Sequence, residues 1–154
     1  EYEMKDNLPI TLQEVTPANF NECISLKRDN SRYVGNAESV LAQAYIYRND
    51  SLAYAIYLHE TVIGLVIIRV HPTERCPYAF TELFIADDFQ KQGFGKQAVE
   101  VILDKFRNEK KSDLVRIQVH QDNNIAIGIY EKYGFVEVKR AEWNHDFLVM
   151  ELVL

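Results

Sequence analysis

The sequence predicts an α/β (α+β) protein, with a mixed, mostly antiparallel central sheet of about seven strands flanked by about four helices. Two observations support this fold class. Short runs rich in branched and aromatic residues have the length and polarity of strands. Between them lie segments whose apolar residues recur at helical spacing, and such helices bury their apolar stripes against a sheet. The predicted order of elements is β-α-α-β-β-β-α-β-α-β-β.

The size and charge of the chain are those of one globular domain over residues 1–154. This length suits a single core and is too short for two ordinary domains. The formal net charge of −6 argues against nucleic acid as a partner and mildly favours a cationic small molecule. No apolar run reaches the length of about 18 residues that spans a membrane. Residues 1–6 lack the pattern of a secretory signal, so we expect no membrane partner and a cytoplasmic location.

The cysteines and histidines predict neither a disulfide framework nor a metal site. Cys23 and Cys76 are far apart in the chain. The four histidines lack the spacing of zinc-binding motifs. We therefore expect no metal cofactor.

The first half of the chain predicts one strand, two helices and then three strands. Residues 10–15 alternate apolar and polar side chains, as a half-buried strand does. A proline in the first turn begins a helix that ends near Leu26, and Asn36 caps a second helix that ends near Arg48. A hairpin and a third strand follow, over residues 52–58, 62–70 and 78–86. Gly64 indicates a bulge or a close contact.

The second half predicts a long helix, a short helix and three strands. Residues 97–106 carry apolar side chains at helical spacing, and residues 114–119 alternate as a strand does. Asparagines cap a short helix over residues 125–133, which Gly134 stops. Two strands, over residues 135–138 and 147–154, are expected to pair antiparallel. The apolar residues 147–150 allow a homodimer, but burial within one chain explains them as well.

A glycine-bearing loop separates the strand that ends at Ala86 from the helix that begins at Gln97. It reads Q-K-Q-G-F-G-K over residues 90–96. The first turn of a helix has N–H groups without intrahelical partners and a partial positive charge, so a phosphate bound there is stabilised. A tight strand-to-helix connection by itself also explains Gly93 and Gly95. The loop matches neither the phosphate loop of nucleotide hydrolases nor the dinucleotide-binding fingerprint.

Two motifs resemble those of the Gcn5-related N-acetyltransferase (GNAT) superfamily. The loop resembles its acyl-CoA pyrophosphate motif, Q/R-x-x-G-x-G/A. Residues 123–135, N-N-I-A-I-G-I-Y-E-K-Y-G-F, resemble its motif N-x-x-A-x-x-L/I-Y-x-x-x-G-F. The predicted order of elements is also that of the GNAT fold. The first half of the chain further resembles the bacterial spermine/spermidine N-acetyltransferases, in residues 10–16, 23–27 and 36–45.

The resemblance implies that acetyl-CoA is the co-substrate and indicates where it binds. Backbone N–H groups of the loop would hold the pyrophosphate, with Gln90 as a neutral contact and Lys91 or Lys96 adding positive charge. The pantetheine arm would pair with the preceding strand like an additional strand, and Asn123 would help to anchor it. The residues assigned to acetyl-CoA are Leu83, Phe84, Ile85, Gln90, Lys91, Gln92, Gly93, Phe94, Gly95, Lys96, Asn123 and Tyr130.

Direct transfer of the acetyl group to an amine needs a base and an acid. The acceptor amine arrives protonated and must lose a proton before it attacks. Glu82, inside an otherwise apolar strand, is the candidate base, although a solvent-facing position explains it equally well. His120, at the end of the neighbouring strand, is the reserve base. The resemblance implies that Tyr130 protonates the leaving CoA thiolate, whereas a tyrosine on an apolar helix face is by itself usually a core residue.

The acceptor is expected to be a primary amine, and the resemblance of the first half favours a polyamine such as spermine or spermidine. Another amine, such as a protein N-terminus, a lysine or an aminoglycoside, is the alternative among enzymes. A CoA-binding module without activity is the alternative outside catalysis. Carboxylates and aromatic faces would hold a polycation. The candidates are Glu22, Asp29, Glu38, Glu74, Glu142, Asp146, Tyr33, Tyr78 and Trp143.

Overall fold

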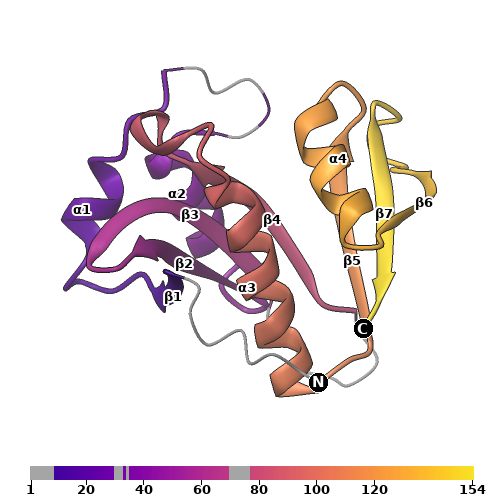
Figure 1. Ribbon diagram of the computed structural model, residues 1–154, viewed down its shortest axis with the longest axis horizontal. Helices are drawn as coiled ribbons and strands as arrows, with labels where there is room; N and C mark the ends of the chain where they lie inside the picture. Colours follow the sequence, from indigo (N-terminus) through magenta and orange to yellow (C-terminus); the bar gives the residue numbers. More distant parts are fainter. Residues whose placement is uncertain (1–8, 30–32, 34, 70–76) are drawn as a thin grey trace.

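Seven strands of the described chain form two sheets that meet at one point (Figure 1). The structure, a computed structural model, describes residues 9–29, 33, 35–69 and 77–154. The first sheet is antiparallel with the order β1-β2-β3-β4, and its strands are β1 (Ile10–Glu14), β2 (Ser51–Leu58), β3 (Thr61–Arg69) and β4 (Ala79–Ile85). The second sheet is antiparallel with the order β5-β7-β6, and its strands are β5 (Leu114–His120), β6 (Val136–Arg140) and β7 (Phe147–Val153).

The two sheets join just before β4 and then diverge. Tyr78 forms a parallel bridge with Val115, donating its N–H to the Leu114 carbonyl at 2.8 Å and accepting from the Arg116 N–H at 2.7 Å. β5 pairs with β7 along its whole length. Beyond the bridge, Glu82 of β4 has a φ of 55° beside a shift in the β3–β4 register. A bulge of this kind bends its strand. The predicted α/β class is confirmed, but the predicted single sheet is split.

Helices cover both faces of the first sheet, so the protein has two apolar clusters. α1 (Phe20–Ile24) and α2 (Ala37–Ile46) lie on one face, and α3 (Phe94–Glu109) lies on the other (Figure 1). α4 (Asn124–Lys132) packs against the cluster under α3. Along β3, Ile67 belongs to the cluster under α2 and Ile68 to the cluster under α3, because side chains alternate along a strand.

The helix boundaries differ from prediction at two N-termini. α1 begins only at Phe20, because the Asn19 side chain closes a turn before it by accepting from the Thr16 N–H at 2.8 Å. α3 begins at Phe94, three residues earlier than predicted, after a left-handed residue at position 93. The predicted cap of α2 is confirmed, since the Asn36 side chain accepts from the Ser39 N–H at 3.0 Å.

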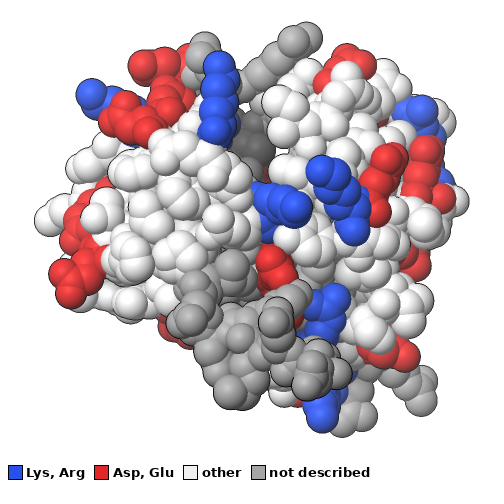
Figure 2. All heavy atoms as spheres, in the orientation of Figure 1, with Lys and Arg blue, Asp and Glu red and all other residues white. Residues whose placement is uncertain are grey.

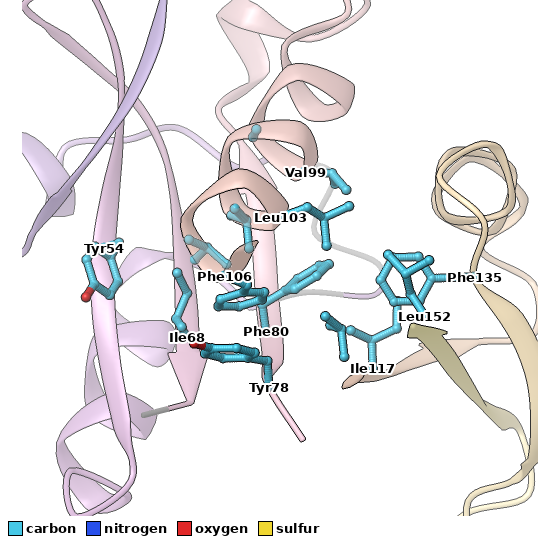
Figure 3. Packing of buried hydrophobic residues seen from close by; sticks show 14 of the residues in the cluster. Tyr54, Ile68, Tyr78, Phe80, Val99, Leu103, Phe106, Ile117, Phe135 and Leu152 are labelled. Atoms are coloured by element: carbon cyan, nitrogen blue, oxygen red, sulfur yellow. The ribbon is translucent and has the colours of Figure 1, made fainter. Parts of the chain in front are cut away.

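Tyr78 lies in the core under α3 (Figure 3). It is 4% exposed, and its ring stacks on Phe106 with the ring centroids 4.1 Å apart. Its hydroxyl accepts a hydrogen bond from the Lys111 N–H at 3.0 Å. Tyr78 is therefore mainly a core residue, and its side chain also lines a pocket of about 300 Å³ together with Tyr54 and Glu109.

Gly64 of β3 lies where a side chain does not fit. A Cβ at this position would be 2.2 Å from the Phe84 carbonyl oxygen. The predicted close contact is thus confirmed, and it allows the end of β4 to lie against β3 immediately before the glycine loop.

Candidate active site

Gly93 ends the glycine loop and caps α3. It has a φ of 83°, in the left-handed region that glycine tolerates. Its carbonyl accepts from the Gln97 N–H at 3.2 Å. The N–H groups of Phe94, Gly95 and Lys96 precede that bond, so helix geometry provides them with no intrahelical acceptor. A Cβ on Gly93 would meet nothing within 4 Å, and the backbone is therefore open to the approach of a phosphate.

The two glutamines of the loop form hydrogen bonds with the residues that precede it. The amide nitrogen of Gln90 donates to the Ile85 carbonyl at 3.0 Å and to Asp87 Oδ1 at 3.4 Å. The amide nitrogen of Gln92 donates to the Asp88 carbonyl at 3.5 Å. Both nitrogens are engaged within the protein, so the loop presents backbone N–H groups, rather than these side chains, to an anion.

Basic side chains lie beside the loop. Lys91 and Lys96 are exposed, and Lys91 has a φ of 63°. Figure 2 shows Lys and Arg side chains at the junction between α3 and α4. Together with the partial positive charge at the start of α3, these ammonium groups suit a pyrophosphate.

The edge of β4 that faces β5 is available for backbone pairing after the bridge at Tyr78. In the described chain β4 pairs with β3 alone, and the bulge at Glu82 turns its backbone. Leu83 and Ile85 pack on the α3 side, whereas Phe84 is buried on the α2 side. This edge has the geometry that the predicted pantetheine contact requires.

Tyr130 of α4 lies against the first sheet. The centroid of its ring is 5.8 Å from that of Phe80 on β4 and 5.7 Å from that of Phe135. Burial raises the pKa of its hydroxyl to about 12, so Tyr130 keeps its proton at neutral pH. Although the two sheets diverge, α4 thus places a protonated tyrosine beside β4.

Asn123 caps the helix that carries Tyr130. Its Oδ1 accepts from the Ala126 N–H at 3.3 Å, and its own N–H donates to the His120 carbonyl at 2.9 Å. Among the described residues its side-chain nitrogen has no protein acceptor. That nitrogen is therefore available to the predicted pantetheine arm.

Glu82 lies beside the segment that connects α1 and α2. Its carboxylate accepts from the Gly35 N–H at 3.4 Å. The Arg28 guanidinium lies 4.6 Å from the centroid of the Phe84 ring; burial lowers the pKa of Arg28, and attraction to Asp87 and then Glu82 opposes this shift. Glu82 thus has a backbone N–H and a cation near it, in addition to the apolar residues of its strand.

His120 is less suited than Glu82 to accept a proton. Its Nδ1 accepts from the Asp122 N–H at 3.1 Å, so the neutral ring carries its hydrogen on Nε2 and has no free lone pair. The ring lies 5.1 Å from that of Tyr33 and 5.2 Å from that of Phe147, between centroids. This geometry favours Glu82 as the base.

A pocket of about 460 Å³ opens on the face of the sheets opposite α3. Residues 79–81 of β4 and residues 116–118 of β5 line it, together with residues from the end of α2, from β2 and from β3. Lining residues include Asp50, Arg69, Ala79, Thr81, Arg116 and Gln118. The indole Nε1 of Trp143 donates to Gln118 Oε1 at 2.7 Å, which places this aromatic ring at the rim.

The acidic residues predicted for an amine pocket do not line this one. Its carboxylate within the described residues is Asp50. Sequence reasoning missed Arg69, Arg116 and Gln118. The alternation of β5 could have indicated two of them, since Val115, Ile117 and Val119 are buried, whereas Arg116 and Gln118 between them are exposed. The predicted residues outside the lining are Glu22, Asp29, Glu38, Glu142 and Asp146, and Glu74 lies outside the described residues.

Residues 9–29, 33, 35–69 and 77–154 contain neither a metal-binding cluster nor a membrane-spanning helix. No group of three or more His, Cys, Asp and Glu side chains there is arranged to hold a metal ion. None of the helices there is both long and apolar enough to cross a bilayer. Cys76 and His71 lie outside the described residues.

Comparison with known proteins identifies the family. Residues 20–135 match the Acetyltransferase (GNAT) family. The chain belongs to the GNAT family. The protein is therefore an acetyl-CoA-dependent N-acetyltransferase, and its two diverging sheets are those of the GNAT fold.

Individual GNAT relatives differ in what they acetylate. The "Probable N-acetyltransferase san" of Drosophila melanogaster is 28% identical over 135 residues, covering 86% of this chain and 71% of that protein. A spermidine N-acetyltransferase from Vibrio cholerae, solved with CoA and spermine, has a TM-score of 0.74 at 18% identity and covers 94% of this chain and 95% of its own. The ribosomal-protein-S18-alanine N-acetyltransferase from Escherichia coli has a TM-score of 0.70 at 15% identity, covering 94% and 93%. At these identities the structures share the fold alone.

Proposed function

We propose that this GNAT enzyme transfers acetyl from acetyl-CoA directly to a primary amine that enters from the α2 side. The main support is the position of Tyr130, which is partly buried and packs against Phe80 of the strand that leads into the glycine loop. The loop and α3 lie on one side of β4, and the pocket and Glu82 lie on the other. The two substrates would meet across β4.

Acetyl-CoA supplies the thioester that the amine attacks. The N–H groups of Phe94, Gly95 and Lys96, with the ammonium of Lys91, would hold its pyrophosphate. The backbone edge of β4 from Leu83 to Ile85 would hold the pantetheine arm, and one of these N–H groups would donate to the thioester carbonyl as negative charge develops on it.

Glu82 would remove the proton from the acceptor amine, directly or through water. The carboxylate is held by the Gly35 N–H on the acceptor side of β4, where an incoming amine would reach it. An unprotonated amine then attacks the thioester carbonyl and the thiolate leaves. No covalent acetyl-enzyme is needed.

Tyr130 would supply the proton that the leaving thiolate takes up. Its hydroxyl remains protonated at neutral pH because burial raises its pKa to about 12. A thiolate in the same apolar surroundings is destabilised in the same way, so its affinity for a proton also rises. Burial therefore raises the proton affinity of the donor and of the acceptor together.

The polyamine acceptor predicted from the sequence has two supports and one obstacle. The fold is shared with the Vibrio cholerae spermidine N-acetyltransferase. Four rings also lie in a row, Tyr33, His120, Phe147 and Trp143, with neighbouring centroids 5.1, 5.2 and 4.7 Å apart, and aromatic faces attract cations. The obstacle is the pocket below that row, where Arg69 and Arg116 would repel a polycation.

Replacing Tyr130 by phenylalanine tests the mechanism. Tyr130→Phe removes the hydroxyl and keeps the ring, so we expect kcat to fall about 100-fold with little change in KM for acetyl-CoA. Thiol release with spermidine, a short peptide and an aminoglycoside as acceptors measures it. The control is Tyr133→Phe, which removes a tyrosine hydroxyl three residues after Tyr130. That hydroxyl donates to the Lys96 carbonyl. An unchanged kcat in Tyr130→Phe would contradict the acid role of Tyr130. If the unmodified protein bound acetyl-CoA but acetylated none of these amines, it would be a CoA-binding module.

A further inference from the structure

We propose that the pocket on the α2 side binds a carboxylate of the acceptor, so that the preferred acceptor is a polypeptide N-terminus with an acidic side chain at its third residue. The inference rests on the proposed function, because that function places the reacting amine at Glu82. The proposed acceptor therefore carries one positive and one negative group, whereas a polyamine carries only positive groups.

Two guanidinium groups from different sheets converge on this pocket. Arg69 ends β3 of the first sheet, and Arg116 lies on β5 of the second. The carboxylate among the described lining residues, Asp50, binds Nη2 of Arg69 at 3.0 Å. Both arginine side chains remain accessible, at 48% and 44% exposure. The described lining thus carries an excess of positive charge in a protein whose net charge is negative.

Arg116 has N–H donors beyond the one that binds Glu151. Its Nε donates to Glu151 Oε1 at 3.1 Å, and within the described residues its two Nη groups donate to no protein acceptor. A guanidinium presents five N–H donors in a fork that matches a carboxylate with two parallel hydrogen bonds. A ligand carboxylate could therefore bind Arg116 while the contact with Glu151 is kept.

The register of the strands sets the distance between this carboxylate site and the reacting amine. Arg69 is paired with Ala79, three residues before Glu82 on β4. At the rise of a strand this separation is about 10 Å. An extended peptide of about three residues, with its amine at Glu82, spans this separation.

Neutral hydrogen-bonding groups lie between the two ends. Thr81 of β4 and Gln118 of β5 line the pocket between the arginines and Glu82. Such groups suit the backbone of an extended peptide, which needs donors and acceptors along its length. A free polyamine chain has methylene groups at these positions and would leave them without partners.

A matched pair of peptides tests the proposal. Two tetrapeptide amides would carry either glutamate or glutamine at the third residue, and their dissociation constants would be measured by calorimetry. We expect the glutamate peptide to bind about tenfold more tightly at low salt, because a partly exposed charge pair contributes on this scale. Fluorescence of Trp143, the only tryptophan, should change on binding, since its indole is bonded to the pocket residue Gln118. Equal affinities, or tighter binding of spermidine than of the glutamate peptide, would overturn the proposal.

Variants connect the preference to the arginines. Arg116→Gln should remove the preference for glutamate, and Arg116→Lys should retain part of it because the charge remains without the fork. Arg107→Gln, on exposed α3 surface, is the control that should keep the full preference. A preference that survives Arg116→Gln would also contradict the proposal.

Thiol release assays with the same peptides test the transferase mechanism and the carboxylate site separately. Selective binding without release of CoA would contradict the transferase mechanism and retain the carboxylate site. Turnover of both peptides with the same kcat/KM would retain the mechanism and reject the site.

Discussion

At the scale of single residues, the proposed chemistry depends on one carboxylate. Glu82 is held by the Gly35 N–H on the acceptor side of β4, near the Arg28 guanidinium. We expect Glu82→Gln to lower kcat/KM for the amine about 100-fold at neutral pH, because an amide cannot accept the proton. The deficit should shrink as the pH rises through the pKa of the acceptor amine, which is about 8 for a peptide N-terminus and about 10 for a lysine or polyamine. Kinetics from pH 7 to 10 would measure this, with Glu60→Gln in an exposed turn as the control. A deficit that does not vary with pH would assign proton removal to another group.

At the scale of elements, the start of α3 makes a prediction about two glycines. Gly93→Ala would force a side chain into left-handed backbone, which costs about 1 kcal/mol, and would place a methyl group where a phosphate approaches. We expect a lower Tm and a KM for acetyl-CoA several-fold higher. Gly95 is helical, and a Cβ there would meet Ile85 only at 4.0 Å, so Gly95→Ala should stabilise α3 by up to about 1 kcal/mol. Thermal unfolding and acetyl-CoA kinetics of both variants would test this. An unchanged KM in Gly93→Ala would mean that the phosphates bind elsewhere.

At the scale of the whole molecule, both apolar clusters bury groups that resist ionisation. Burial, aided by Glu22, raises the pKa of the Cys23 thiol to about 11 under α2, and burial raises the pKa of Tyr130 to about 12 beside β4. The same groups ionise near pH 8.5 and 10 in an unfolded chain. Because the fold favours the protonated forms, their contribution to stability is complete below about pH 8.5 and is lost as the pH rises towards 11 and 12. Urea unfolding from pH 7 to 11 should show this decline in the free energy of unfolding. In Cys23→Ala the decline that begins near pH 8.5 should be smaller. A free energy of unfolding that is constant to pH 11 would contradict the effect.

Local patterns were enough for most element boundaries. β2 and β3 were predicted within one residue, because alternation and the hairpin turn act over neighbouring residues. The caps formed by Asn36 and Asn123 were also predictable, since a cap is a contact over three residues. The start of α3 was not, because it depends on the left-handed φ of Gly93, which sequence permits without requiring.

The candidate site also has parts that the sequence predicted and parts that it did not. Sequence motifs predicted the glycine loop and Tyr130, which lie within continuous segments. They did not predict that Arg28 would face Glu82, nor that Arg69 and Arg116 would share a pocket, because these contacts join segments that are distant in the chain.

By itself, the sequence determined the α/β class, the order of elements and the membership of the GNAT family, since each depends on short-range spacing. Only the tertiary structure decided that the sheet divides after Tyr78, that Tyr130 lies against Phe80, and that two guanidinium groups line the acceptor side. The physical reason is that strand pairing and burial are settled by contacts between distant segments, and the periodicity of one segment does not specify its partner.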